Sequence, residues 1–111
     1  MASSICTFEN KKKQMKTVFI AFNQALTERI ETILDHQGIR GFTRWVDVQG
    51  RGSNTGEPHM GTHTWPAMNS AILTVIEDKD VESLLDKLKR LNEKSEMQGL
   101  RAFVWSVEAQ I

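Results

Sequence analysis

The chain has little cysteine, no excess of charge of either sign and no long apolar run. Cys6 is its single cysteine, which excludes an internal disulfide and a zinc site built from several cysteines. Lysine and arginine number 14, as do aspartate and glutamate, whereas a general nucleic-acid binder would be clearly basic. No apolar stretch reaches the length of a membrane span, and no signal-peptide core opens the chain. We therefore expect a cytoplasmic protein that neither binds nucleic acid nor inserts into a membrane.

The length of 111 residues predicts one domain. Residues 1–14 show no clear periodicity and end in a run of lysines, so we expect them to form a disordered extension. Those lysines suit either an anionic contact or a solvated tail. The folded domain is then expected to span residues 15–111.

Apolar periodicity predicts six elements in this domain. Strands are expected at 17–22, 39–48, 70–76 and 101–107. A helix is expected from about Leu26 to Gly38, and a second one from an Asp78 or Asp80 cap to about Ser95. The order strand, helix, strand, strand, helix, strand is that of ferredoxin-like folds. It predicts an α+β domain with a four-stranded antiparallel sheet, both helices on one face, and a long loop between the second and third strands.

Both faces of the predicted sheet carry apolar side chains. In the first strand Val18 and Ile20 point one way, and Phe19 and Ala21 point the other. Strands of this kind normally have both sides buried, and two helices cover only one side. Burial of an apolar side chain is worth roughly 1.5–3 kcal/mol, so an uncovered apolar face would be costly in a monomer. We therefore predict an obligate homo-oligomer in which the sheets of different copies pack together.

The long loop between the second and third strands contains four glycines and two prolines. Loops of this length in compact domains are usually functional or disordered. Its glycines allow backbone conformations that other residues resist. We interpret the loop as the working part of a small regulatory or binding domain. The glycines and the prolines are Gly50, Gly52, Gly56, Gly61, Pro58 and Pro66.

Four segments of the chain resemble PII signalling proteins, in the order in which that family has them. Residues 38–43 (Gly-Ile-Arg-Gly-Phe-Thr) resemble the Gly-x-x-Gly-x-Thr opening of the second strand, and residues 50–52 (Gly-Arg-Gly) resemble the hinge of the T-loop. Residues 53–65 stand where the T-loop stands, and residues 103–108 are similar to the last core strand, Phe-Val-x-x-Val-Glu. The resemblance covers about residues 15–108. It implies a homotrimer with three sheets packed around a central axis.

The resemblance also implies a signalling role and a set of site residues. PII proteins bind adenine nucleotides in clefts between subunits, and their T-loop docks onto an enzyme, transporter or transcription factor. The implied base pocket is Gly41, Phe42 and Thr43; the implied phosphate contacts are Gly50, Arg51 and Gly52; the implied opposing loop supplies Gln98, Gly99 and Arg101. In the 53–66 loop, the residues implied to contact a partner protein are Asn54, Glu57, His59, Met60, His63 and Trp65.

Several departures mark the chain as a divergent PII-like protein. It has no tyrosine, so the T-loop tyrosine that some PII proteins use for covalent modification is absent. Asn54 stands where the family has a glutamine that helps to hold 2-oxoglutarate, and residues 96–101 are poorer in glycine than the family's loop. The segment between Thr43 and Gly50 is one residue longer than usual, which requires a bulge or a reversal of side-chain facing.

An alternative is a metal-binding or metal-responsive trimer, because His59 and His63 lie close together in the loop. Imidazole suits zinc, copper and nickel, and Met60 or Glu57 could add a ligand. CutA, a family with the same trimeric fold, has been linked to metal tolerance, which is an argument by analogy only. The other interpretation is a mobile polar loop with two incidental histidines, and a trimer without any ligand is a third possibility.

Catalysis has little support in the sequence. Ser53 and Ser70 lack the context of a nucleophile elbow, and His36 ends the first predicted helix, where an imidazolium interacts well with the helix dipole. We predict that the protein is not an enzyme and requires no cofactor. The three tryptophans fit either subunit packing or an aromatic surface for a base or a partner; they are Trp45, Trp65 and Trp105.

Overall fold

The computed structural model describes residues 14–48, 68–94 and 99–111 of the chain. Residues 1–13 of the predicted extension and most of the long loop, residues 49–67, lie outside the described residues. The elements are β1 (Met15–Asn23), η1 (Gln24–Leu26), α2 (Thr27–His36), β2 (Thr43–Val48), β3 (Asn69–Glu77), η3 (Asp78–Asp80), α3 (Val81–Lys94) and β4 (Leu100–Ser106), where η denotes a short 3-10 helix. This order confirms the predicted ferredoxin-like α+β fold.

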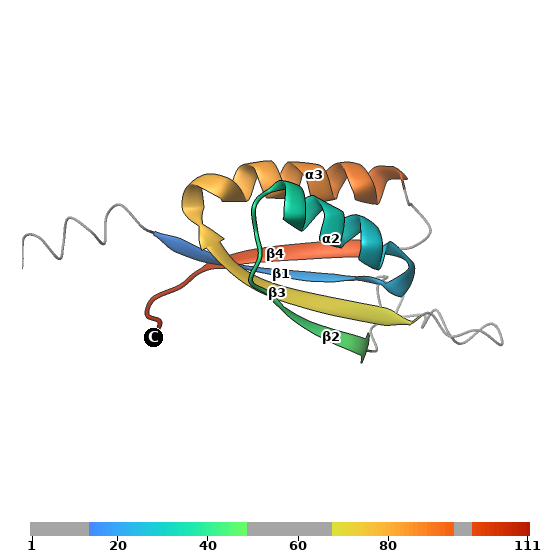
Figure 1. Cartoon of the computed structure of the whole chain (residues 1–111), viewed down its shortest axis with the longest axis horizontal. Coiled ribbons are helices and arrows are strands. Elements are labelled where there is room, and N and C mark those ends of the chain that lie inside the picture. Colours follow the sequence, from blue (N-terminus) through green and yellow to red (C-terminus); the bar gives the residue numbers. More distant parts are fainter. Residues whose placement is uncertain (1–13, 49–67, 95–98) are drawn as a thin grey trace, which may run out of the picture.

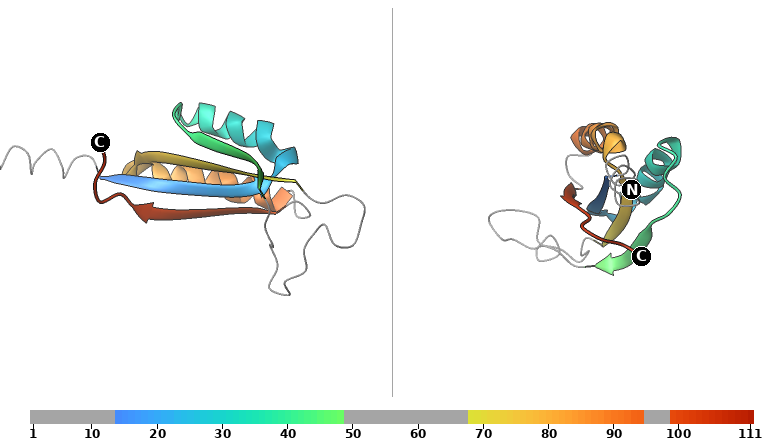
Figure 2. Two further views of the ribbon diagram at one scale, coloured as in Figure 1. Left: turned by 90° about the horizontal axis from the view of Figure 1, so that it is seen from below. Right: turned by 90° about the vertical axis from the view of Figure 1, so that its left-hand side faces the viewer.

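The four strands form one antiparallel sheet in the order β2-β3-β1-β4. β1 is central and pairs with β3 from Met15 to Asn23 and with β4 from Lys16 to Phe22. Both helices lie on one side of the sheet, and no described element lies on the other side (Figure 1). The view along the strands in Figure 2 shows the same two-layer arrangement. The predicted placement of both helices on one face is therefore confirmed.

The core fills the space between the helices and the sheet. Alternate residues of β1 point into it because successive side chains of a strand face opposite sides. The helices contribute apolar positions at a spacing of three or four residues, which places them on one face. The buried members of the core are Val18, Ile20, Phe22, Leu26, Ile30, Leu34, Ile39, Ile72, Ile76, Leu84, Leu88, Leu91 and Leu100.

Helix α2 ends where the sequence predicts, at a glycine with a left-handed backbone. Gly38 has φ of 76°, and its N–H donates to the carbonyl of Asp35 at 3.0 Å. The N–H of Ile39 donates to the carbonyl of Leu34 at 2.9 Å. These two hydrogen bonds are those of a Schellman motif, in which a hydrophobic residue after the glycine packs back on the helix. Ile39 is buried for this reason.

The second strand is shorter than the sequence predicts. Residues 39–48 are apolar enough to indicate a strand, but β2 begins only at Thr43. The Schellman motif turns Ile39 into the core, and the chain then needs residues 40–42 to reach the edge of the sheet. The predicted start of the strand was wrong because the end of the helix uses the first apolar residue of this stretch.

The extra residue before Gly50 is absorbed as a bulge in β2. Trp45 pairs with Ala71 and Val48 pairs with Asn69, so β2 has two residues between these pairs where β3 has one. Asp47 lies in the irregular stretch with φ of 58°, a left-handed conformation that aspartate tolerates better than most residues. The predicted bulge is confirmed.

Candidate functional site

The sheet face opposite the helices is apolar and open in the single chain. Phe19 lies between Leu73 of β3 and Phe103 of β4, and Thr17 lies between Val75 and Trp105. The side of the sheet that the helices leave free therefore carries a continuous set of aromatic and aliphatic side chains. Four of its members are more than a third exposed: Trp45 (45%), Val75 (39%), Phe103 (55%) and Trp105 (48%). We call this surface, formed by Phe19, Ala21, Trp45, Ala71, Leu73, Val75, Phe103 and Trp105, the open sheet face.

The predicted effector residues that the structure describes fall into two separate groups. Gly41, Phe42 and Thr43 lie at the start of β2, which is one edge of the sheet. Gly99 and Arg101 lie at the start of β4, which is the other edge. β3 and β1 stand between the two groups, so a single chain does not bring them together. A site that uses both groups needs two chains.

The first group, Gly41 to Thr43, is held by the buried hydroxyl of Thr74. Thr74 is 2% exposed, and its Oγ1 donates to the backbone carbonyl of Gly41 at 2.7 Å. Apart from Gly41 and its two chain neighbours, no atom of the chain's described part lies within 4 Å of the place where a Cβ of Gly41 would be. The carbonyl of Gly41 is thus held by Thr74, and the space beside its Cα is free. Phe42 is 36% exposed and follows directly.

The second group is held by two asparagines that the sequence analysis did not single out. The N–H of Asn23 donates to the carbonyl of Gly99 at 3.3 Å, and the N–H of Leu100 donates to Oδ1 of Asn92 at 3.1 Å. Gly99 itself has φ of 67°, which favours glycine. Arg101 is exposed and pairs with Ala21, which places it on the open sheet face. Asparagine at the end of a strand or in the last turn of a helix is the only signal for this role in the sequence.

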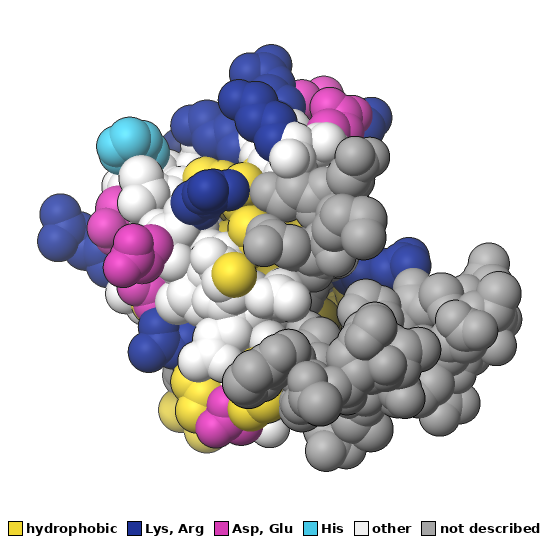
Figure 3. Space-filling model, turned by 90° about the vertical axis from the view of Figure 1, so that its right-hand side faces the viewer, with side chains coloured by type: hydrophobic (Ala, Val, Ile, Leu, Met, Phe, Trp, Pro, Cys, Tyr) yellow, Lys and Arg dark blue, Asp and Glu magenta, His cyan; other side chains and the backbone are white. Residues whose placement is uncertain are grey.

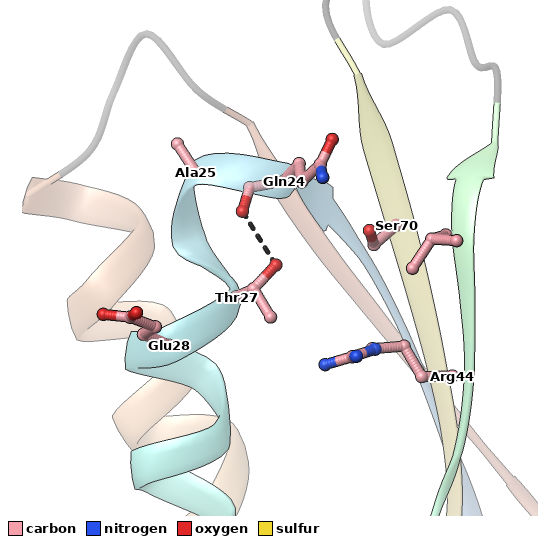
Figure 4. A pocket seen from close by; sticks show the side chains of 7 residues that line it. Gln24, Ala25, Thr27, Glu28, Arg44 and Ser70 are labelled. Carbon is pink, nitrogen blue, oxygen red and sulfur yellow. Dashed lines mark hydrogen bonds between the residues drawn. The ribbon is translucent and has the colours of Figure 1, made fainter.

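A concave region lies on the helix side of the sheet. A pocket of 340 Å³ opens between the start of α2 and the strands β2 and β3 (Figure 4). Its lining is Gln24, Ala25, Thr27, Glu28, Arg44, Val46 and Ser70. Arg44 Nη1 also forms an ion pair with Glu31 Oε2. None of these residues belongs to the predicted effector site, and they come from three parts of the sequence that carry no recognisable motif.

Figure 3 views the end of the molecule where β1 passes into α2. Lysine and arginine side chains gather at the top of this view, on the side of the helices, and hydrophobic side chains lie at its foot, next to acidic ones. β2 ends and β3 begins at this end (Figure 1). The bulge of β2 and the pocket therefore lie at the end of the domain from which the predicted T-loop starts.

The remaining predicted site residues lie outside the described ranges. They are the phosphate-contact residues Gly50, Arg51 and Gly52, the residue Gln98, and the loop residues Asn54, Glu57, His59, Met60, His63 and Trp65. Metal binding by His59 and His63 stays a prediction for the same reason. In residues 14–48, 68–94 and 99–111, no group of three or more histidine, cysteine, aspartate or glutamate side chains could hold a metal ion. No helix in this part of the chain is both long and apolar enough to cross a membrane.

Comparison with known proteins places the chain in a family. The model of the family "Nitrogen regulatory protein P-II" matches residues 15–111. A search of curated proteins found no significant match.

Solved structures of PII-like proteins share the fold. The protein CPII from Thiomonas intermedia K12, bound to ADP, AMP and bicarbonate, superposes with a TM-score of 0.66 at 20% identity, covering 87% of this chain and 96% of that one. Its apo form gives a TM-score of 0.61 at 18% identity, with coverage of 85% and 91%. A PII-like signalling protein from Thermus thermophilus gives 0.62 at 21% identity, with coverage of 86% and 88%. The family match over residues 15–111, together with the sheet order and helix placement described above, shows that this chain belongs to the nitrogen regulatory protein P-II family.

Proposed function

We propose that the protein is a homotrimeric signalling protein that binds an adenine nucleotide between subunits and regulates a partner protein through the 53–66 loop. One observation carries the proposal: the described effector residues lie on opposite edges of the sheet. Gly41 to Thr43 and Gly99 to Arg101 are separated by two strands within a chain, so only contact between two chains joins them.

The open sheet face supports association of the chains. Phe103 and Trp105 are each about half exposed in the single chain and lie on the same side of β4. Burying such side chains stabilises by roughly 1.5–3 kcal/mol each. Contiguous apolar patches of this kind on a soluble protein usually mark an interaction surface. Packing the open faces of three chains together removes this surface from water.

The chemistry of the two edge groups supports a nucleotide as the effector. The unobstructed Cα of Gly41 lets a flat ring approach the backbone, and Phe42 beside it offers an aromatic surface. Arg101 supplies a cation for phosphate oxygens from the other edge. CPII, which shares the fold, has been captured with ADP and AMP. Regulation of a partner through the loop is the role that the family relation favours.

The experiment is a thermal-shift titration of the full chain with ADP, AMP and ATP, coupled to a solution mass. A ligand that binds only the folded protein raises the melting temperature as its concentration increases. The expected result is a saturable rise with at least one adenine nucleotide, and a smaller rise in Gly41→Val. That variant is expected to keep the melting temperature of the free protein, because no described atom beyond the chain neighbours of Gly41 lies within 4 Å of the added Cβ. The absence of any response to the three nucleotides would contradict the proposed effector.

A further inference from the structure

The pocket on the helix side contains a buried hydroxyl without a hydrogen-bond partner. Ser70 is 1% exposed, and its Oγ has no partner among the described residues. Buried polar groups are nearly always paired, and an unpaired one is costly, so each exception needs an explanation. Figure 4 shows the Ser70 hydroxyl directed toward the start of α2, across the pocket from the side-chain amide of Gln24. A ligand oxygen between the two would accept a hydrogen bond from the Ser70 hydroxyl and another from the Gln24 amide.

The other polar groups of the pocket are already oriented. Thr27 Oγ1 donates to the carbonyl of Gln24 at 2.7 Å, which leaves its lone pairs free to accept. Arg44 points from β2 toward α2 (Figure 4). One of its nitrogens pairs with Glu31. A guanidinium has five N–H donors, so this pairing leaves donors for a second acceptor. The pocket thus offers a cation, two hydroxyls and an amide, and the Thr27 hydroxyl and the Arg44 guanidinium are held by these contacts before any ligand arrives.

The charges around the pocket decide the ligand class. Arg44 and Glu28 line it, and Glu31 adds a second carboxylate beside Arg44. A simple anion would add negative charge next to two carboxylates, and a simple cation would leave the donors of Arg44 and Ser70 without an acceptor. A small molecule with one carboxylate and one ammonium satisfies both sides. The volume of 340 Å³ accommodates a molecule of the size of a single amino acid.

We propose that this pocket binds a free α-amino acid. Its carboxylate accepts from Arg44 and from the Ser70 hydroxyl, its ammonium lies toward the acceptor oxygens of Thr27 and Gln24 on the Glu28 side of the pocket, and its side chain lies against Val46. The proposal does not rest on the nucleotide site, which uses other residues on the edges and the open face of the sheet.

A ligand in this pocket would contact the irregular part of β2. Val46 belongs to the irregular stretch of β2, one residue before the left-handed Asp47. A molecule held between Val46 and the start of α2 ties the bulged end of β2 to the helix layer. It therefore acts on the strand from which the 49–67 segment leaves.

The test is calorimetric titration and thermal shift of the full chain with the twenty amino acids, followed by a matched set of probes. Alanine, propionate and ethylamine have similar size and differ in charge, and for the best ligand its deaminated and decarboxylated analogues serve the same purpose. The expected result is saturable binding of at least one amino acid and at least tenfold weaker binding of both analogues. No response to any amino acid overturns the proposal. If the deaminated carboxylate binds as tightly as the amino acid, the pocket is an anion site and the proposal of a zwitterionic ligand is overturned.

Variants separate a binding role from a structural one. Arg44→Gln and Glu31→Gln break the same ion pair, but only the first removes a ligand contact. We expect Arg44→Gln and Ser70→Ala to weaken binding about tenfold, which is the loss of one strong hydrogen bond, whereas Glu31→Gln keeps or improves it. Equal effects of Arg44→Gln and Glu31→Gln on binding would contradict the proposal. The response to ADP serves as the control for folding, since none of the three residues belongs to the proposed nucleotide site.

Discussion

Phe19 and Phe103 lie directly opposite each other on the central strand and its β4 neighbour, on the sheet face that neither helix covers. Directly paired aromatic side chains stabilise an antiparallel sheet, yet Phe103 is 55% exposed in the single chain. The pair is therefore well placed within the sheet and incompletely buried. Association of the chains through this face would complete the burial.

A charge at this pair is expected to break the assembly while the fold persists. Phe103→Arg places a guanidinium on the open sheet face, where it would be buried without a partner in a trimer. The solution mass measured by light scattering should fall from the mass of a trimer to that of a monomer, and the circular dichroism spectrum should keep its helical signal. Phe103→Leu is the matched control and should remain a trimer. An unchanged mass for Phe103→Arg would show that this face is not the contact between chains.

The hydrogen bond from Thr74 to Gly41 is expected to stabilise the start of β2. Thr74→Val keeps the shape of the buried side chain but removes the 2.7 Å hydrogen bond to the Gly41 carbonyl. The loss of one such bond costs about 1 kcal/mol of unfolding free energy, measured by urea denaturation. Thr74→Ser keeps the hydroxyl and loses a methyl group, so it should retain the effector response. Equal ADP affinity in the valine and serine variants would mean that this hydrogen bond does not position Gly41 for a ligand.

The left-handed residue in the β2 bulge leads to a stability prediction. Asp47 has φ of 58°, where a β-branched side chain is strained. Asp47→Val is expected to lower the free energy of unfolding by about 1–2 kcal/mol, whereas Asp47→Asn and Asp47→Gly should change it little. Chemical denaturation of the three variants measures the difference. A valine variant as stable as the asparagine variant would contradict the left-handed conformation.

The end of α2 provides a fourth prediction. Gly38 has φ of 76° and no atom of the described chain lies near its missing Cβ, so a substitution there acts through the backbone and not through a clash. Gly38→Ala is expected to lower the free energy of unfolding, measured by urea denaturation, by about 1 kcal/mol. Gly41→Ala is the matched control, because Gly41 has the same free space and no positive φ, and it should leave the stability nearly unchanged.

The fold was predictable because its signals are local. Apolar periodicity set the order of strands and helices, and Gly38 marked the end of α2. The spacing between Thr43 and Gly50 required either a bulge or a reversal of side-chain facing, and β2 contains the bulge. The start of β2 was not predictable in the same way. Ile39 is apolar enough for a strand, and only the tertiary structure shows that it packs back on the helix.

The site was predictable in part. The motif at residues 38–43 and the loop before β4 identified the two edge groups, but Asn92 and Thr74, which hold them, carry no motif. The helix-side pocket was missed entirely. Ser70 occurs in a strand-forming stretch and Arg44 in another, and their proximity to Gln24 arises from the pairing of β1, β2 and β3.

The mass of the full chain in solution tests the central claim most directly. Sedimentation equilibrium over a range of low micromolar concentrations should give three times the chain mass of 12.6 kDa, with no dissociation to folded monomers. A single well-folded species of 12.6 kDa would leave the open sheet face in water and the two groups of effector residues apart, and would contradict the account.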